Sequence, residues 1–372
     1  MGRRASLGLF VGIWLCCLAA CTPASIAIGE HFYVAPVRLE LHEQLGLQAK
    51  VSGLAVHGDL VEVMERRRRF ARVRLGSSAM GWVDSTDLLS AQQWAKLQLL
   101  NTQSAAMPVQ GVAAPFSMLN VHTDPNRKSP SFYIAAEEES IDVMGHIVTP
   151  RVEHDPRYAA GYDPASVPAD TPLDDWHLIR VRRTSDGPDA NRAGWVLSRL
   201  LFFRLPDAVT QQANGAAIVA AVPLGRVNDA DDGEPHEHWL MATVTARNKP
   251  YEFDTVRVLI WNANRHRYDI TFLQRELMGY YPIQPHPTPG QLAGFSLLVQ
   301  TGELERERRT YAFGRAGSGN RPKVISTETI QLPKPVPPKR EDYVAPIPSE
   351  PATPAVPPYW QRVRARWRTA WS

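Results

Sequence analysis

The strongest constraint on how this 372-residue chain folds is a run of residues that occurs twice. The first copy ends in Phe70-Ala-Arg-Val-Arg-Leu75 and, after a short loop, Gly81-Trp82-Val83. The second copy ends in Trp176-His-Leu-Ile-Arg-Val-Arg182 and, after a longer loop, Gly194-Trp195-Val196. An internal duplication of this kind indicates that each copy is one structural unit.

The duplication continues upstream of these endings. Gly58-Asp-Leu-Val-Glu-Val-Met64 corresponds to Glu138-Glu-Ser-Ile-Asp-Val-Met144, and further back we align Val37-Arg-Leu39 with Leu119-Asn-Val121. Apolar residues alternate with polar ones in these runs, which is typical of short β-strands between turns. About five such strands in some sixty residues predict a small β-barrel for each copy.

Both copies resemble the bacterial Src-homology-3-like (SH3b-type) domain. The first copy (31–90) carries the matching Gly58-Asp59, Val61 and Val63, Val73-Arg74, Gly81-Trp82-Val83 and Leu88; the second (112–204) carries Leu119-Asn-Val121, Ile141 and Val143, Trp176, Gly194-Trp195-Val196 and Leu200. Three features depart from the family pattern: Phe70 replaces a tryptophan, His122 an arginine, and Glu138-Glu139 a glycine turn. The resemblance implies recognition of peptidoglycan or peptide in the groove between the barrel loops.

The repeated Gly-Trp-Val motif has a structural interpretation of its own. A tryptophan on a barrel strand is mainly a large apolar filler, so we expect Trp82 and Trp195 to pack in cores rather than stack on a ligand. The glycine before each tryptophan allows another strand to approach closely.

The first residues have the pattern of an export signal. Arg3-Arg4 precedes an apolar run from Leu7 to Leu18, which is short for a membrane span. Leu18-Ala-Ala-Cys21 resembles the bacterial lipobox, which implies cleavage before Cys21 and lipidation of its thiol; the alternative is a plain signal peptide that contains a cysteine. We therefore predict a lipoprotein signal peptide at 1–20, a tether at 21–30 and a membrane anchor at Cys21. Thr22 is not the Asp that retains lipoproteins in the inner membrane, which favours the outer membrane, facing the periplasm, in a diderm cell.

Composition excludes several classes of function. The three cysteines are Cys16, Cys17 and Cys21, so the predicted mature chain has no disulfide, no thiolate zinc site and no cysteine nucleophile. The net charge is only +3, which argues against nucleic acid as a partner. The Asn228–His238 run is rich in Asp and His but lacks the spacing of a calcium or zinc site, and we interpret it as a solvated turn. Arg66–Arg69 is interpreted as a solvated loop tip, with acidic lipid or wall polymer as the alternative contact. We predict no metal site, no cofactor, no small-molecule substrate and no catalytic residues.

Between and after the two copies the chain changes character. Ser90-Ala-Gln-Gln93 has the form of a capping box and predicts a helix over 91–103, within a helix and linker at 91–111. The second copy carries an insertion at about 150–175, for which a functional loop and a disordered loop remain open. Region 207–332 is a β-rich domain of unknown family that predicts an antiparallel sandwich or barrel, with one helical turn at Leu273–Met278. Its seven expected strands are 216–222, 239–246, 256–261, 268–272, 295–301, 310–313 and 324–332.

The C-terminal residues are of two kinds. Region 333–358 is proline-rich and predicts a disordered, extended linker. Region 359–372 predicts a basic amphipathic helix. Its candidate contacts with a membrane or an anionic polymer are Trp360, Arg362, Arg364, Trp367, Arg368 and Trp371. The alternatives are docking onto the protein itself and a disordered basic tail.

Together these features predict a mainly β protein: two small SH3-like barrels in tandem, then a third antiparallel β domain and a disordered tail. We expect a non-enzymatic, lipid-anchored binding and scaffolding protein of the cell envelope. Its expected partners are the membrane, through the lipid anchor, and peptidoglycan or envelope proteins. The alternatives are an envelope enzyme with an active site in 207–332, and a structural subunit of an envelope complex.

Overall fold

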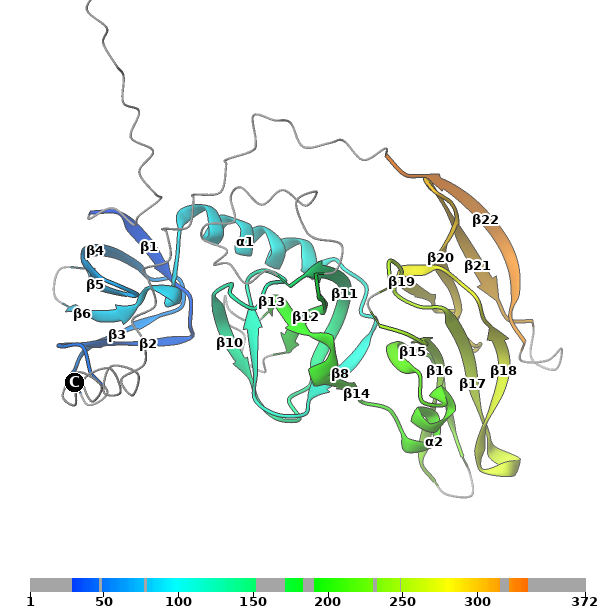
Figure 1. Cartoon of the computed structure of the whole chain (residues 1–372). Coiled ribbons are helices and arrows are strands. Elements are labelled where there is room, and N and C mark those ends of the chain that lie inside the picture. The colour runs from blue at the N-terminus through cyan, green and yellow to red at the C-terminus, as the bar shows by residue number, and fades with distance from the viewer. Residues whose placement is uncertain are drawn as a thin grey trace, which may run out of the picture. The chain divides into compact units, whose positions relative to one another are not determined.

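The computed structural model describes residues 29–46, 49–76, 79–151, 171–182, 191–229, 233–247, 249–314 and 321–333. All of them belong to one compact unit, Ile28–Pro346. The mainly β fold class predicted from the sequence is confirmed: the described chain forms four antiparallel sheets and one long helix (Figure 1). None of the described helices is long and apolar enough to cross a membrane.

The first repeat, residues 31–89, is one seven-stranded sheet. Its strands are β1 (His31–Val34), β2 (Arg38–His42), β3 (Val51–Val56), β4 (Leu60–Arg67), β5 (Phe70–Leu75), β6 (Ala79–Asp84) and β7 (Leu88–Leu89). They lie in the order β3-β2-β6-β5-β4-β1-β7, and a 3-10 helix, Ser85–Asp87, precedes the last strand. The inward row of Val61, Val63, Val73 and Val83 is almost wholly buried, as the alternation in the sequence predicts.

The second repeat, residues 111–203, has the same plan. Its strands are β8 (Gly111–Pro115), β9 (Leu119–His122), β10 (Ser131–Ala135), β11 (Ile141–Pro150), β12 (Leu173–Arg182), β13 (Asn191–Leu197) and β14 (Leu201–Phe203). Their order, β10-β9-β13-β12-β11-β8-β14, matches that of the first repeat strand for strand. A 3-10 helix, Ser198–Leu200, again precedes the last strand. The predicted duplication is therefore a duplication of structure.

Local irregularities recur at equivalent places. The pairing of β4 with β5 shifts register between Val63 and Glu65, and that of β11 with β12 shifts between Val143 and Gly145. His42 pairs with Trp82, and His122 pairs with Trp195. The last two pairs correct one alignment: the equivalent of Leu119-Asn-Val121 is Leu39-Glu-Leu41, not Val37-Arg-Leu39. The error was two residues, which leaves the inward and outward positions of a strand unchanged.

The glycine turn that the second repeat lacks is retained in backbone conformation. Gly58 has a φ of 87°, and Glu138, at the equivalent position, has a φ of 58°. The next residue caps the turn in both copies, since Asp59 Oδ2 accepts from the Val56 amide at 2.9 Å and Glu139 Oε2 accepts from the Ala136 amide at 2.8 Å. Glu138 therefore occupies a left-handed position that favours glycine.

Because of this left-handed position, Glu138→Gly is expected to raise the free energy of unfolding by about 1 kcal/mol, measured by urea unfolding. The exposed Glu138 side chain leaves no cavity, and the contact of Arg204 with the Glu138 carbonyl is kept. Glu137→Gly is the matched control, because Glu137 is exposed but is not among the residues of positive φ. Equal effects of the two substitutions would contradict the prediction.

Helix α1 (Ala91–Ala105) packs against both repeats. The predicted capping box is confirmed: Ser90 Oγ accepts from the Gln93 amide, and Gln93 Oε1 accepts from the Ser90 amide. Leu97 is 1% exposed and lies in one apolar cluster with residues of the first repeat (Ala35, Leu89) and of the second (Ala113, Leu119, Val121). The helix thus braces the two repeats.

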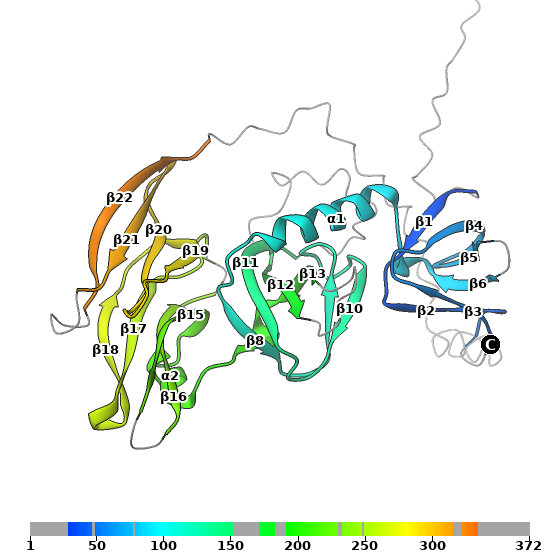
Figure 2. The same cartoon turned by 180° about the vertical axis from the view of Figure 1, so that it is seen from behind.

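Residues 217–331 form a β-sandwich, in which two four-stranded sheets face each other (Figure 2). One sheet contains β15 (Ala217–Asn228), β16 (Pro235–Val244), β17 (Thr255–Asn262) and β18 (Arg267–Gln274); the other contains β19 (Gly279–His286), β20 (Gly294–Gly302), β21 (Glu305–Ala312) and β22 (Lys323–Gln331). A four-residue helix, α2 (Asp207–Thr210), precedes them. The buried core between the sheets includes Val219, Leu240, Val258, Phe253, Ile283, Phe295 and Tyr311.

The sandwich has eight strands where the sequence predicted seven, and the extra one is β19. It carries Pro282 and Pro285, which argue against a central strand, and it lies at the edge of its sheet, where proline is tolerated. The predicted helical turn Leu273–Met278 is wrong. Leu273 and Gln274 end β18, and Glu276 takes a φ of 59° in the connection to β19.

Candidate functional site

The tryptophans of the two Gly-Trp-Val motifs lie in packed surroundings. Trp82 is 7% exposed, and the Arg67 guanidinium lies 5.4 Å from the centre of its ring. Trp195 is half-buried and packs against Met144, Leu178 and Ala193. Trp176, at the position of Phe70 in the first repeat, is fully buried. The expectation that these rings serve the cores rather than a ligand agrees with this burial.

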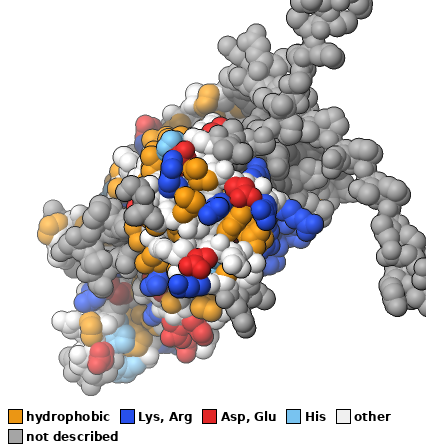
Figure 3. Space-filling model, turned by 90° about the vertical axis from the view of Figure 1, so that its left-hand side faces the viewer, with side chains coloured by type: hydrophobic (Ala, Val, Ile, Leu, Met, Phe, Trp, Pro, Cys, Tyr) orange, Lys and Arg blue, Asp and Glu red, His pale blue; other side chains and the backbone are white. Residues whose placement is uncertain are grey.

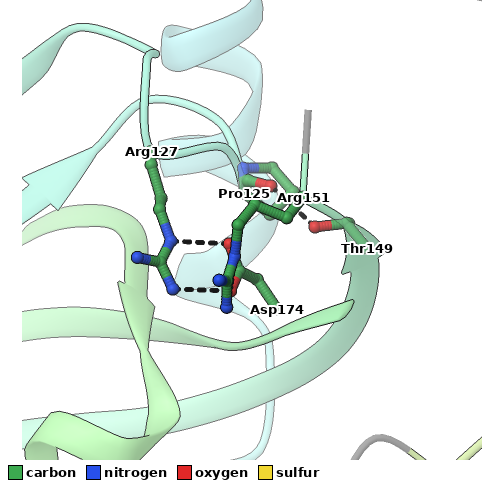
Figure 4. Close-up of polar contacts among 5 residues, drawn as sticks. All are labelled: Pro125, Arg127, Thr149, Arg151 and Asp174. Carbon is green, nitrogen blue, oxygen red and sulfur yellow. Dashed lines mark hydrogen bonds and ion pairs between the residues drawn. The ribbon is translucent and has the colours of Figure 1, made fainter. Parts of the chain in front are cut away.

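The described residues at the base of the insertion in the second repeat are held by a double arginine clamp (Figure 4). Asp174, on β12, is 5% exposed in its side chain and accepts hydrogen bonds from Arg127 Nε and Nη2, both at 2.7 Å. Arg151, just after β11, donates to the same carboxylate from Nη2 at 2.8 Å. Thr149 Oγ1 donates to the Pro125 carbonyl beside them at 3.0 Å.

Two opposing effects set the charge of this clamp. Burial alone would raise the pKa of Asp174, but the hydrogen bonds and charges of Arg127 and Arg151 outweigh it and hold that pKa below its usual value. The carboxylate is therefore ionised and fully engaged. The clamp fixes the loop between β9 and β10 to the ends of β11 and β12; residues 152–170 of the insertion lie outside the described residues.

A second polar cluster lies where the second repeat meets the sandwich. His146 on β11 contacts the Asp175 carboxylate on β12, and the rings of His146 and His177 are 5.5 Å apart. The sandwich contributes Arg247, with Nη1 3.7 Å from Asp175 Oδ2. Glu252 and the half-buried Tyr281 also act electrostatically on this cluster. We call these six residues the junction cluster.

Burial sets the direction of the pKa shift at two members of the junction cluster and is outweighed at a third. It lowers the pKa of His177 to about 4, with the neighbouring His146 adding to the effect, so His177 is neutral. Burial raises the pKa of Glu252 to about 7, against the opposing influence of His146 and Arg306. Burial also acts to raise the pKa of Asp175, but the hydrogen bond and charge of His146 leave it lowered. At neutral pH, Asp175 is therefore ionised and His177 is neutral, while Glu252 keeps its proton up to a pH of about 7.

The arrangement of the junction cluster does not match a nucleophile activated by a base. Ser198 Oγ donates to Asp175 Oδ1 at 2.9 Å, so its proton is directed to the carboxylate and not to an imidazole. Nor do the described residues contain any group of three or more His, Cys, Asp or Glu side chains placed to hold a metal ion.

Gln110 reinforces the same junction through backbone bonds. Its side-chain oxygen accepts from the Ile283 amide at 2.8 Å, and its own carbonyl accepts from the Ala221 amide at 2.8 Å. Gln110 is completely buried. Such satisfied buried polar contacts favour one fixed arrangement of the second repeat and the sandwich.

The acidic, histidine-rich run Asn228–His238, which connects β15 to β16 and includes the start of β16, differs from the predicted solvated turn at both ends. Asp229 is 2% exposed and accepts from Trp261 Nε1 at 2.8 Å, while His238 is 8% exposed and accepts from the Trp261 amide at 3.0 Å. His236 stacks on the Trp261 ring, with centroids 3.7 Å apart. The run is thus anchored to β17 through one tryptophan; residues 230–232 lie outside the described residues.

The remaining predicted site residues lie outside the described part of the chain. These are the lipidation site Cys21 and the candidate surface contacts Trp360, Arg362, Arg364, Trp367, Arg368 and Trp371. They stay predictions. The sequence analysis predicted neither the Asp174 clamp nor the junction cluster, because each joins residues that are far apart in the chain.

Comparisons with known proteins add little to this description. No family model matches the chain, and no curated protein sequence matches it. Among solved structures, NlpC2 and NlpC1 from Trichomonas vaginalis are each 8% identical, cover 81% and 84% of this chain and 96% and 95% of their own, and give TM-scores of 0.15 and 0.16. An NlpC/P60 family protein from Bacillus cereus is 9% identical, covers 84% of this chain and 97% of its own, and gives 0.19. At these TM-scores the likeness supports no conclusion about function.

Proposed function

We propose that this chain is a lipid-anchored protein of the cell envelope, whose two SH3-like modules bind peptidoglycan or peptide segments as a scaffold. The observation that carries the proposal is the repeated plan of the two sheets, which share strand order, bulge position and the 3-10 helix before the last strand. A small barrel of this plan, present twice, is suited to binding in tandem, because two weak contacts on one chain reinforce each other.

Exposed apolar side chains support a binding role for both repeats. The first repeat exposes Val37, Leu45, Val51, Leu54, Val56, Leu60 and Met80, and the second exposes Phe116, Met118, Ile134, Ile147 and Leu173. Figure 3 shows the side of the molecule where the first repeat lies in Figure 1, with hydrophobic side chains between basic and acidic ones. These side chains supply apolar surface that a bound peptide or glycan would contact.

The binding test is retention of residues 28–346, the compact unit, on purified peptidoglycan, with release of sugar and peptide followed in the same tube. Retention without release is the expected result. Phe116→Ser with Met118→Ser should weaken retention, because these side chains are 59% and 78% exposed on the second repeat. Leu99→Ser is the matched control, since Leu99 is 56% exposed on α1. Release of products would favour an enzyme, and absence of retention would refute wall binding.

The anchor has its own test. Cys21→Ala is expected to leave the exported protein uncleaved or released from the membrane fraction, because the thiol that would carry the lipid is gone. The measurement is fractionation of cells, together with the mass of the protein recovered. A Cys21→Ala protein that fractionates with the membrane at the mature mass would contradict lipidation at this residue.

A further inference from the structure

The β4–β5 hairpin of the first repeat is the most basic turn among the described residues. Arg66 and Arg67 end β4, Arg68 and Arg69 form the tip, and Arg72 follows on β5. Arg67 and Arg69 are 65% and 71% exposed in their side chains. Arg67 pairs with Phe70, so the tip is a tight two-residue turn, in which Arg68 has a φ of 54°.

Two of these arginines form ion pairs with neighbouring carboxylates. Arg67 Nε lies 2.8 Å from Glu65 Oε1, and Arg69 Nε lies 3.0 Å from Asp84 Oδ2. The ion pairs of the hairpin in the described chain involve Arg67 and Arg69, and none involves Arg66, Arg68 or Arg72. This end of the repeat carries five arginines, Arg66 to Arg69 and Arg72. It carries three carboxylates, Glu65, Asp84 and Asp87, the last of which lies near Arg69. The excess is positive, and it is concentrated on an exposed tip.

The register of β1 places the hairpin at the end where the N-terminal segment enters. The Gly29 amide donates to the Val63 carbonyl at 2.8 Å, and the Val63 amide donates to the Glu30 carbonyl at 3.0 Å. Because β1 is antiparallel to β4, the chain enters from the side toward which β4 runs, and β4 runs to the arginines. Arg67 is four residues beyond Val63, about 13 Å along the strand. Cys21 precedes Gly29 by eight residues, at most about 28 Å of chain.

We propose that this hairpin is a second membrane contact, in which its arginines bind the anionic headgroups of phospholipids. Guanidinium groups pair with phosphate through two parallel hydrogen bonds, and a basic residue at an anionic membrane surface contributes about 1 kcal/mol. The choice of lipid rather than another polyanion rests on the proposed anchor at Cys21, which holds this end of the repeat near the bilayer. With the anchor, the hairpin fixes the orientation of the first repeat on the membrane.

The test is co-sedimentation of residues 22–346 with vesicles of phosphatidylcholine containing 30% phosphatidylglycerol, at low salt and at 0.3 M salt. This chain keeps the whole compact unit and lacks both Cys21 and the basic region 359–372, so neither of these contributes to the binding. We expect binding that falls at high salt and is absent on pure phosphatidylcholine. Arg66→Gln with Arg68→Gln should weaken it about tenfold or more.

The matched control is Arg265→Gln with Arg267→Gln, which removes the same charge from another exposed hairpin, between β17 and β18. Equal loss in both double variants, or no loss in the first, would overturn the proposal. So would equal binding to neutral vesicles or no binding to anionic ones. None of these results depends on lipidation or wall binding, which the fractionation and peptidoglycan experiments test separately.

Discussion

Gly194→Ala is expected to lower the free energy of unfolding by about 2 to 3 kcal/mol, because a Cβ at this position has no room. It would lie 2.6 Å from Val121 Cγ1 and 2.7 Å from two ring carbons of Phe132. Both neighbours are almost fully buried, so neither turns away without opening a cavity. The measurement is urea unfolding followed by tryptophan fluorescence, since Trp195 is adjacent.

The first repeat provides an internal check on this prediction. A Cβ on Gly81, the equivalent residue, would lie 2.6 Å from Ser52 Oγ and 2.8 Å from the Leu41 backbone, so Gly81→Ala should also destabilise. Gly302→Ala is the control, because its Cβ would meet only Glu305 Cβ, at an ordinary 3.4 Å. A midpoint for Gly194→Ala no lower than that for Gly302→Ala would mean that the close approach of β13 to β9 does not limit packing.

Gly81 and Gly194 belong to the part of the fold that was predictable from the sequence. The Gly-Trp-Val motif, the alternating strands and the Ser90 capping box are local signals, and local signals predict local structure well. The duplication added a second, independent copy of each signal, which is why the strand content of both repeats was predictable. Even so, the alignment of β2 with β9 was two residues off, because a shift of two preserves the same inward face.

The candidate site was much less predictable, for a physical reason. Asp174 meets Arg127 from 47 residues away, and Gln110 meets Ile283 from 173 residues away. No spacing rule connects such residues, because tertiary packing alone brings them together. Strand β19 was missed for a different reason: its prolines give a turn signal, and only its position at a sheet edge makes them compatible with a strand. The sequence also gives no sign that His177 differs from an ordinary strand residue, because only the structure shows that it is buried.

Glu252→Gln is expected to stabilise the protein above pH 7 by about 1 to 3 kcal/mol, because it removes a carboxylate that must ionise in a buried site. The pKa of Glu252 is raised from 4.5 to about 7 by burial, and its Oε2 finds no hydrogen-bond partner within the described residues. Between pH 4.5 and 7 the folded wild-type protein therefore holds a proton that the unfolded chain has lost. Its free energy of unfolding falls as the pH rises through this window, and the variant lacks that fall.

His177 makes the pH profile of this variant distinctive. Its pKa is lowered from 6.5 to about 4, so between pH 4 and 6.5 the unfolded chain binds the extra proton and stability rises with pH. In the wild type the contributions of Glu252 and His177 oppose each other from pH 4.5 to 6.5, whereas in Glu252→Gln the rise contributed by His177 is no longer offset by Glu252. Thermal unfolding from pH 4 to pH 8 measures the difference, with the exposed Glu303→Gln as control. Parallel profiles for wild type and Glu252→Gln would show that Glu252 is hydrated, and that the junction between the second repeat and the sandwich is open to water.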